Sequence, residues 1–472
     1  MSFTLISAMS DDPNGRPVGG TEYSLCRAVP GGSGITVVAL LLSHPPNLTS
    51  LQNTLHKLQK SHPILRSKLQ NPTPPSPSFS ISTSPSLQIQ TFDLPTTTNL
   101  LKTLSPQDPP RQIPPFHLLL EHQLNQNPWS QQPQNPTSQF DVFYATLYSL
   151  SESRWVVALR LHGSVCDRTS AVVLAREVVW LMREGEGGAK WEIEDEGCGG
   201  EVGLAIEELV PKGKGDKPFW ARGADLVGYP LNYIRTANLG FEDVCTDRRT
   251  EVVRFQLDRD ETDHLLSKCR ERDIKLSGAI AAAALIAANS SKHLPNNQSE
   301  NYAVLTLVDC RGSLDPAPLD HHLGFYHSGI LNMQSITKGE RLWDVAKRCY
   351  TAFSNALKCN KHFTDMGVLN FLMCKAVENP GLTPSLSMRA SYISVFEDPV
   401  IDDSYELHQE VGLEDYIGCA SVHGFGPSIV VSDTIRNGQL DCSCMYPSPL
   451  HSRKQMQELI DEMKKILVRG DG

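Results

Sequence analysis

The apolar positions of the first 70 residues predict a buried strand followed by a helix. Residues 34–44 (GITVVALLLSH) are dense in β-branched and aliphatic side chains, as buried strands are, and two prolines end the run. Residues 51–69 carry apolar side chains mostly at helical spacing, with an interruption at His62 and Pro63. We therefore expect a helix that resumes after Pro63 as ILRSKL.

Residues 71–139 are rich in Pro, Ser, Thr, Gln and Asn, a composition that weakens regular structure. Three runs, SFSIS, SLQIQTF and PPFHLLLEHQL, hold enough apolar residues for short strands. The segment is expected to form a looped part of the first lobe, with a disordered or mobile tip at residues 125–137.

Two apolar segments then form a predicted hairpin, DVFYATLYSL and SRWVVALRL, joined by a short polar turn. The second segment ends in LHGSVCD, and SAVVLAREVVWLMREG follows with a helical apolar face. The pattern therefore predicts strand, loop and helix, with a His and an Asp on the loop.

Residues 185–203 are rich in glycine and acidic residues and mark a boundary. The second half is predicted to contain the strand VVRFQLD, a helix at 260–273, a buried Ala-rich helix at 276–289, the strand AVLTLVD and a helix at 342–357. It ends in a hairpin at 427–447, where Asn437 and Gly438 are a strong turn signal, and a helix at 452–467.

The whole pattern predicts a mixed α/β (α+β) protein without internal repeats. The chain has 472 residues, 40% of them hydrophobic, which suits two medium cores. We expect an N-terminal lobe over residues 1–185, a crossover over 186–250 and a C-terminal lobe over 251–472.

Charge and cysteine content narrow the class of protein. The net charge of −10 argues against nucleic acid as a partner. The 12 cysteines lack zinc-type spacings and are expected to be reduced thiols, which fits the cytosol. No run of about 18 apolar residues and no signal-like N-terminus is found, so we expect no membrane partner.

Five blocks together resemble one superfamily, the CoA-dependent acyltransferases related to chloramphenicol acetyltransferase, which includes the BAHD and alcohol acetyltransferases and the condensation domains. Residues 51–69 resemble the first helix of condensation domains, and 143–170 the hairpin before their HHxxxDG motif. Residues 255–288 resemble the start of the second BAHD half, 308–330 the DxR block, and 420–431 the DFGWG block. The resemblance spans nearly the whole chain.

The resemblance implies a chloramphenicol acetyltransferase-like fold of two lobes with a solvent channel between them. It also implies a small-molecule substrate and acyl-CoA as co-substrate, with no permanently bound cofactor. We expect a monomer.

Matched to HHxxxDG, His162 takes the first His, Gly163 the second, and Asp167 the Asp, while Arg168 replaces the Gly. The family's general base is the second His, which this chain lacks. The resemblance also implies a structural ion pair between Asp167 and Arg311 of the DxR block.

Two histidines are candidates for the missing base, His162 and His423. Neighbouring side chains of a strand point to opposite faces, so His162 faces away from position 163 unless Gly163 lets the backbone turn. The alternative is a structural His162. His423 lies in the glycine-flanked loop that stands where the family has DFGWG, and a polar loop residue is the alternative there.

The remaining candidates are contacts to the substrate or acyl donor. Cys166 needs a nearby base to act as a nucleophile, and none is visible, so an inert thiol is favoured. A metal site at His321, His322 and His327 with Asp320 is not favoured, because adjacent histidines rarely converge. The predicted contact residues are Gly163, Ser164, Cys166, Ser277, Gly424, Phe425 and Gly426.

The sequence therefore predicts an acyl-CoA-dependent acyltransferase acting on a hydroxyl or amine of a small specialised metabolite. Because of Gly163, the alternative is a divergent member that binds a small molecule or promotes another reaction. The basic cluster Lys212, Lys214 and Lys217, beside Phe219 and Trp220, is interpreted as solvated rather than as a coenzyme contact.

Overall fold

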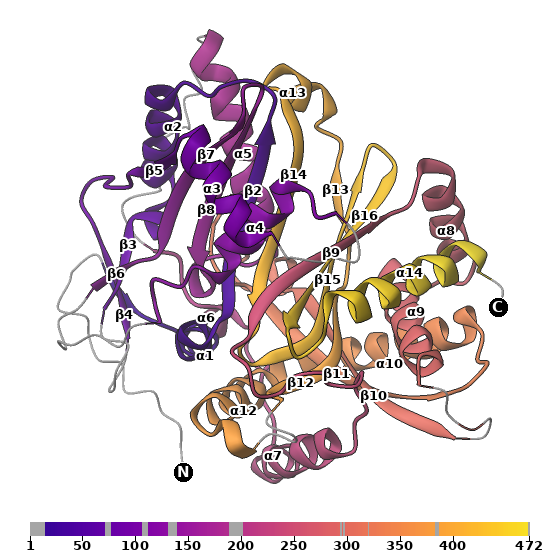
Figure 1. Ribbon diagram of the computed structural model, residues 1–472. Coiled ribbons are helices and arrows are strands. Elements are labelled where there is room, and N and C mark those ends of the chain that lie inside the picture. The colour runs from indigo at the N-terminus through magenta and orange to yellow at the C-terminus, as the bar shows by residue number, and fades with distance from the viewer. Residues whose placement is uncertain are drawn as a thin grey trace.

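The chain folds into two mixed α/β lobes that lie side by side (Figure 1). The computed structural model describes residues 15–70, 77–105, 112–130, 139–187, 202–292, 295, 298–319, 321–382 and 387–470. The predicted fold class is confirmed, because each lobe is built on a mixed sheet with helices packed on it.

The first lobe is built on a five-stranded sheet in the order β14-β2-β8-β7-β5. Its central strands are those with the strongest apolar runs, β2 (Ser33–Leu42) and β8 (Arg154–His162), and β8 pairs antiparallel with β7 (Phe143–Ser151) as the predicted hairpin. Helices α2 (Leu48–Ser61) and α5 (Arg168–Gly187) pack against each other beside this sheet, and α4 (Pro115–Asn125) contributes to a second cluster around β2.

The second lobe is built on a larger mixed sheet in the order β11-β10-β12-β15-β16-β9, with β13 (Val400–Asp402) paired to β15. The Ala-rich helix α9 (Leu276–Ser290) is buried as predicted, between this sheet and the helices α10 (Leu342–Lys358) and α14 (Arg453–Arg469). Small side chains on α9 let both neighbouring helices approach closely, which is why an all-apolar helix is stable here.

One strand from the second half of the chain joins the sheet of the first lobe. Strand β14 (Leu413–Val422) comes late in the chain but pairs antiparallel with β2 in the first sheet, and helix α13 (Tyr405–Glu410) packs on α5. The next strand, β15 (Gly426–Arg436), returns to the second sheet. The loop between β14 and β15 therefore joins the lobes, and the division at residues 185 and 251 stays a prediction.

Two predictions of local structure were wrong. ILRSKL does not continue the helix but forms the 3-10 turn η2 (Pro63–Arg66) and strand β3 (Ser67–Gln70). PPFHLLLEHQL forms helix α4 instead of a strand; Pro114 and Pro115 stand at the helix start, where a missing backbone donor costs nothing. The predicted mobile tip lies partly outside the described residues, since 131–138 are not described.

The remaining elements complete both lobes. In the first half they are β1 (Arg16–Pro17), α1 (Gly20–Ala28), η1 (Val29–Gly31), β4 (Ser78–Ile81), β5 (Ile89–Phe92), α3 (Leu94–Leu104), β6 (Gln139–Asp141), η3 (Gly163–Val165), α6 (Ile206–Leu209) and α7 (Phe219–Ile234). In the second half they are β9 (Arg249–Gln256), α8 (Arg259–Glu271), β10 (Ser299–Asp309), η4 (Arg311–Ser313), β11 (His327–Thr337), α11 (Lys361–Thr364), α12 (Met366–Glu378), η5 (Pro380–Leu382), β12 (Arg389–Phe396) and β16 (Gln439–Ser448).

Candidate active site

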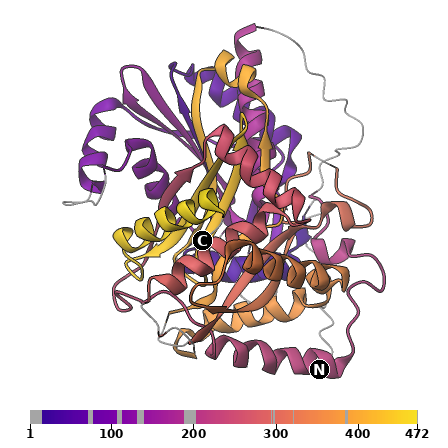
Figure 2. The same cartoon turned by 90° about the vertical axis from the view of Figure 1, so that its right-hand side faces the viewer.

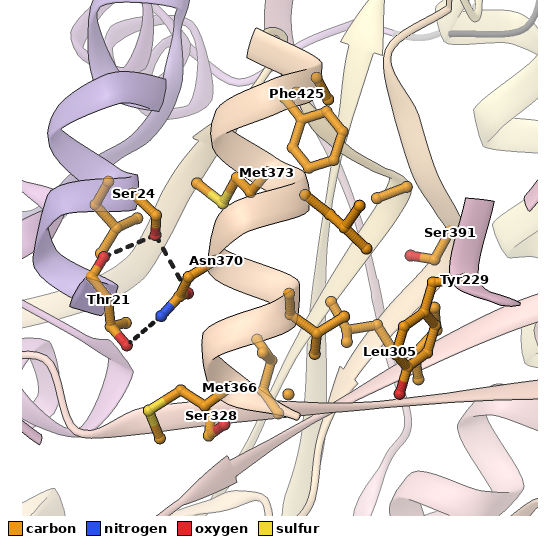
Figure 3. A pocket seen from close by; sticks show the side chains of 18 of the residues that line it. Thr21, Ser24, Tyr229, Leu305, Ser328, Met366, Asn370, Met373, Ser391 and Phe425 are labelled. Atoms are coloured by element: carbon orange, nitrogen blue, oxygen red, sulfur yellow. Dashed lines mark hydrogen bonds between the residues drawn. The ribbon is translucent and has the colours of Figure 1, made fainter. Parts of the chain in front are cut away.

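A cavity of about 410 Å³ lies where the two lobes meet, a volume typical of small-molecule sites. Helix α1 of the first lobe forms one wall, and β10, β11, α12 and α7 form the others (Figure 3). Most of the lining is aliphatic or aromatic. The apolar lining residues include Leu25, Leu305, Leu307, Phe325, Leu331, Met366, Leu369, Met373 and Phe425.

A few polar groups interrupt this apolar wall. Asn370 of α12 donates through Nδ2 to Thr21 Oγ1 at 2.9 Å, and Ser24 Oγ lies 3.4 Å from Asn370 Oδ1 (Figure 3). These contacts tie α1 to α12 across the lobe boundary. On the opposite side, the Ser391 hydroxyl is buried and has no hydrogen-bond partner within the described part of the chain.

The Asp167 carboxylate, close to the cavity, accepts hydrogen bonds from several groups. It lies after β8 and η3, directly before α5, where its Oδ1 accepts from the backbone N–H of Ser170 at 2.8 Å. Oδ1 also accepts from Arg311 Nη2 at 3.0 Å, and Oδ2 from the N–H of Tyr326 at 2.8 Å. Arg311 Nη1 lies 2.9 Å from Oδ2, so the two residues that sequence matching paired are in contact.

These neighbours keep the Asp167 side chain ionised. Burial alone would raise the pKa of Asp167, but the Arg311 guanidinium and the His327 imidazole outweigh burial and hold that pKa well below its usual range. Burial opposes the charge on Arg311 too, yet Asp167 and then Asp309 raise its pKa overall. The carboxylate is therefore an anion at any pH at which the protein is expected to work.

His327 is the histidine that lies at the cavity. It begins β11, its side chain lines the cavity, and its Nδ1 lies 2.9 Å from Asp167 Oδ2. Because an ionised carboxylate only accepts hydrogen bonds, Nδ1 must carry a proton. Nε2 has no hydrogen-bond partner among the described residues. In the neutral ring Nε2 is therefore the unprotonated nitrogen of a histidine that lines the cavity.

His162, the first base candidate, lies elsewhere. It is 1% exposed and is not among the residues that line the cavity. Its Nδ1 lies 2.7 Å from Ser164 Oγ, accepts from the Ser164 backbone N–H at 3.2 Å, and its ring meets Trp129 edge-on. Burial lowers the pKa of His162 to about 3. This environment holds a neutral ring in the core of the first lobe.

Gly163 occupies a position with no room for a side chain. It begins the turn η3, and a Cβ built on it would lie 2.3 Å from the backbone oxygen of Gly34, at the start of β2. The obstacle is backbone, so it cannot rotate away. At the position that sequence matching aligned with the second His of HHxxxDG, strand β2 lies too close for a side chain, and a side chain at 163 would require both segments to move.

We predict that Gly163→Ala lowers the free energy of unfolding by about 1–3 kcal/mol, because the added methyl overpacks the contact with Gly34. Thermal melting would measure the loss. Gly367→Ala is the matched control, since nothing lies within 4 Å of a Cβ at this helical glycine. Equal melting temperatures for Gly163→Ala and the unmodified protein would contradict the prediction.

His423, the second base candidate, is half-buried and also lies outside the cavity lining. Its Nδ1 lies 2.9 Å from Thr250 Oγ1, and its ring covers Gly32, whose φ of 91° is left-handed. Burial and then the charge of Arg389 lower the pKa of His423 to about 4. The ring therefore packs the loop between β14 and β15 onto the first lobe.

The predicted contact residues are spread over several places. Phe425 lines the cavity, whereas Gly424 packs against the backbone of Gly31 and Gly426 begins β15. Ser164 is buried within η3 and Cys166 directly after it, and burial, followed by the charge of Asp167, raises the pKa of the Cys166 thiol far above its usual value. That thiol is not activated as a nucleophile.

Ser277 lies on the other face of the second sheet. It borders a small crevice of about 10 Å³ together with Val304 and Thr306, whereas Leu305 and Leu307 of the same strand line the main cavity. Alternate residues of a strand point to opposite faces, so the sheet separates Ser277 from the cavity.

Two further findings concern metal ligands and membrane spans. In the described part of the chain, no three His, Cys, Asp or Glu side chains converge as metal ligands; Asp320, part of the metal set that was considered, lies outside it. The helices of the described ranges include none that is long and apolar enough to cross a membrane.

Sequence reasoning missed the role of His327 and of α12. His327 was considered only with His321 and His322, because its partner Asp167 is 160 residues away in the chain. One signal could have found it: His327 lies within the same block, 308–330, that supplies Arg311, the other partner of Asp167.

Comparisons with known proteins agree with this architecture. Residues 246–358 match the family model of the phthiocerol/phthiodiolone dimycocerosyl transferase C-terminus. No curated protein matches the sequence. The chain is similar in structure to polyketide synthase associated protein 5 from Mycobacterium tuberculosis, with a TM-score of 0.65 and 15% identity, over 96% of this chain and 97% of that one.

Two further solved structures show the same fold. The trichothecene 15-O-acetyltransferase of Fusarium sporotrichioides matches with a TM-score of 0.70 and 11% identity, over 97% of this chain and 95% of that one. The epimerization domain from the third module of tyrocidine synthetase B matches with a TM-score of 0.60 and 13% identity, over 93% and 91%. These likenesses confirm the predicted two-lobed fold, and the family model adds a resemblance of residues 246–358 to the C-terminus of a dimycocerosyl transferase.

Proposed function

We propose that this protein transfers an acyl group from acyl-CoA to a hydroxyl or amine of a small, largely apolar metabolite, with His327 as the general base. One observation carries the proposal: an imidazole anchored through Nδ1 to a buried carboxylate lines the cavity between the lobes. His162 and His423 do not line that cavity, so we move the base away from both positions.

In the proposed reaction the acceptor oxygen or nitrogen attacks the thioester carbonyl carbon while Nε2 of His327 takes its proton. The carbonyl π electrons move to oxygen and form a tetrahedral intermediate. That intermediate re-forms the carbonyl as the carbon–sulfur bond breaks, and the imidazolium returns the proton to the leaving thiolate. The products are an ester or amide and free CoA.

Asp167 supports this cycle in two ways. Its carboxylate keeps the proton of the neutral ring on Nδ1, so that Nε2 is the basic nitrogen, and it stabilises the imidazolium formed in the transition state. Arg311 and the two backbone N–H donors keep this carboxylate in place. We assign Asp167 and Arg311 as positioning residues.

The buried hydroxyl of Ser391 is a suitable donor to the developing oxyanion. It borders the same cavity and has no competing partner among the described residues, so it can donate a hydrogen bond without first breaking one. Asn370, Thr21 and Ser24 can bind polar atoms of the acceptor, while the apolar wall selects a hydrophobic body.

The test is release of free CoA thiol from acetyl-, malonyl- and aromatic acyl-CoA in the presence of a panel of apolar alcohols and amines. We expect thiol release that depends on the acceptor, together with formation of the acylated product. If no donor is turned over or bound with any acceptor, acyl transfer from CoA is refuted.

A second candidate function follows from Gly163. Since the family's base position is closed by Gly34, a protein that binds a small molecule in the cavity without acyl transfer is the alternative. Calorimetric binding of a panel alcohol without thiol release from any donor would favour this alternative. We further propose that the protein is a monomer and lies in the cytosol.

A further inference from the structure

Helix α7 (Phe219–Ile234) presents an apolar face to solvent. It lies at the periphery of the second lobe, at the bottom edge of both views (Figures 1 and 2). Phe219 is 83% exposed, Trp220 75%, Val227 60% and Leu231 50%. At the helical period of 3.6 residues these four positions, with Gly223 and Pro230 between them, fall on one continuous side of the helix.

The polar side of the same helix faces the protein. Asp225 pairs with Lys217, which also contacts Asp365 at 2.7 Å, and the Tyr229 hydroxyl donates to Asp365. Amphipathic surface helices of globular proteins have the reverse orientation, with the apolar stripe inside. Large aromatic side chains clustered in this way on a surface mark a binding face.

Basic residues flank the apolar face along the sequence. Residues 212–235 contain five basic and two acidic residues, a local charge of +3 in a chain whose net charge is −10. Lys212, Lys214, Arg222 and Arg235 are exposed and form no ion pair with any described residue. Cations around a Phe–Trp apolar face complement an anionic, apolar interface.

We propose that the outer face of α7 docks on the surface of an anionic lipid membrane, with Phe219 and Trp220 inserted between headgroups and the flanking cations on lipid phosphates. The expectation of no membrane partner was based on the absence of a spanning segment, and an interfacial helix needs none. A second copy of this chain fits less well, because the same basic rim would face itself.

The docking face and the cavity share this helix. Tyr229 on the inner side of α7 and Pro230 on its outer side both line the cavity, so docking would place the apolar cavity next to the lipid. Apolar acceptors or acyl chains dissolved in the membrane would then reach the cavity without crossing water. This last step rests on the proposed function, whereas the docking itself does not depend on acyl transfer.

The experiment is co-sedimentation of the full-length protein with phosphatidylcholine vesicles that contain or lack phosphatidylserine. We expect binding to the anionic vesicles, weaker binding to the neutral ones, and at least a tenfold loss of partitioning (about 1.4 kcal/mol) for the double variant Phe219→Ser/Trp220→Ser. Both residues are so exposed that folding should not change, which circular dichroism checks.

The matched control is Ile401→Ser/Tyr405→Ser, which removes two side chains of similar chemistry that are 48% and 50% exposed, in β13 and at the start of α13, far from α7. It should bind vesicles like the unmodified protein. Equal binding of both double variants, or equal binding to neutral and anionic vesicles, would overturn the proposal. So would self-association in sedimentation velocity that Phe219→Ser/Trp220→Ser abolishes in the absence of lipid. Vesicle binding without thiol release would refute acyl transfer and leave docking intact.

Discussion

Replacing His327 with glutamine is expected to lower kcat for acyl transfer by about 10²–10⁴-fold, the usual range for loss of a general base. Glutamine can still donate an amide hydrogen to Asp167, so the carboxylate keeps a partner and the fold should be preserved. It offers no nitrogen that accepts a proton. We therefore expect kcat to fall while KM for the acyl donor changes little, measured by CoA thiol release.

The histidines that the sequence favoured are the natural controls. His423→Gln changes a ring that contacts Thr250 outside the cavity, and His162→Gln one that contacts Ser164 in the core. Each should retain kcat within about tenfold in folded protein, since neither ring lines the cavity. A loss of 10²-fold or more in one of these variants, with His327→Gln unaffected, would return the base to that residue.

Strong local patterns explain which parts of the fold could be predicted. The hairpin of β7 and β8, the helix α9 and the turn between β15 and β16 are encoded by runs of ten or so residues whose own periodicity or turn chemistry decides their structure. Asn437 and Gly438 both have positive φ, as a type I′ turn requires.

The parts that failed depend on distant partners. Strand β14 joins the first sheet because β2 offers an edge there, and nothing in residues 413–422 shows this locally. The space available to a side chain at position 163 is set by the backbone of Gly34, some 130 residues earlier in the chain. The sequence showed that a histidine is missing at 163, but it could not show that no side chain fits there. Helix α7 was not predicted, and its orientation depends on the contacts of Lys217 and Tyr229 with Asp365, which no local pattern shows.

The pairing of Asp167 with His327 also depends on residues that are far apart in the chain. Matching to HHxxxDG drew attention to Asp167, and the resemblance assigned it one partner, Arg311. The fold gives the same carboxylate two further contacts from residues 326 and 327, because β11 starts beside the N-terminus of α5. Residue types on one segment could not indicate that a histidine from another would be oriented by this carboxylate.

Replacing Arg311 with methionine is expected to lower the free energy of unfolding by about 3–5 kcal/mol, the cost of leaving one member of a buried ion pair alone. The Asp167 side chain is 1% exposed, and Arg311 contributes two of its contacts. In the variant, burial is opposed only by His327 and backbone donors, so the pKa of Asp167 should rise. Urea unfolding, followed by circular dichroism, measures the loss.

The sign of the pH dependence gives a second readout. In the unmodified protein the pKa of Asp167 is lower in the folded than in the unfolded state, so its contribution is present above the unfolded pKa and is lost as pH falls. Arg311→Met should therefore make the loss of stability in acid less steep.

Arg341→Met is the control: its pair with Asp344 has a similar distance of 2.9 Å, but the side chains are 70% and 58% exposed. That variant should lose less than about 1 kcal/mol. If Arg311→Met loses no more than Arg341→Met, Asp167 does not depend on Arg311, and the anchor proposed for His327 lacks its main support.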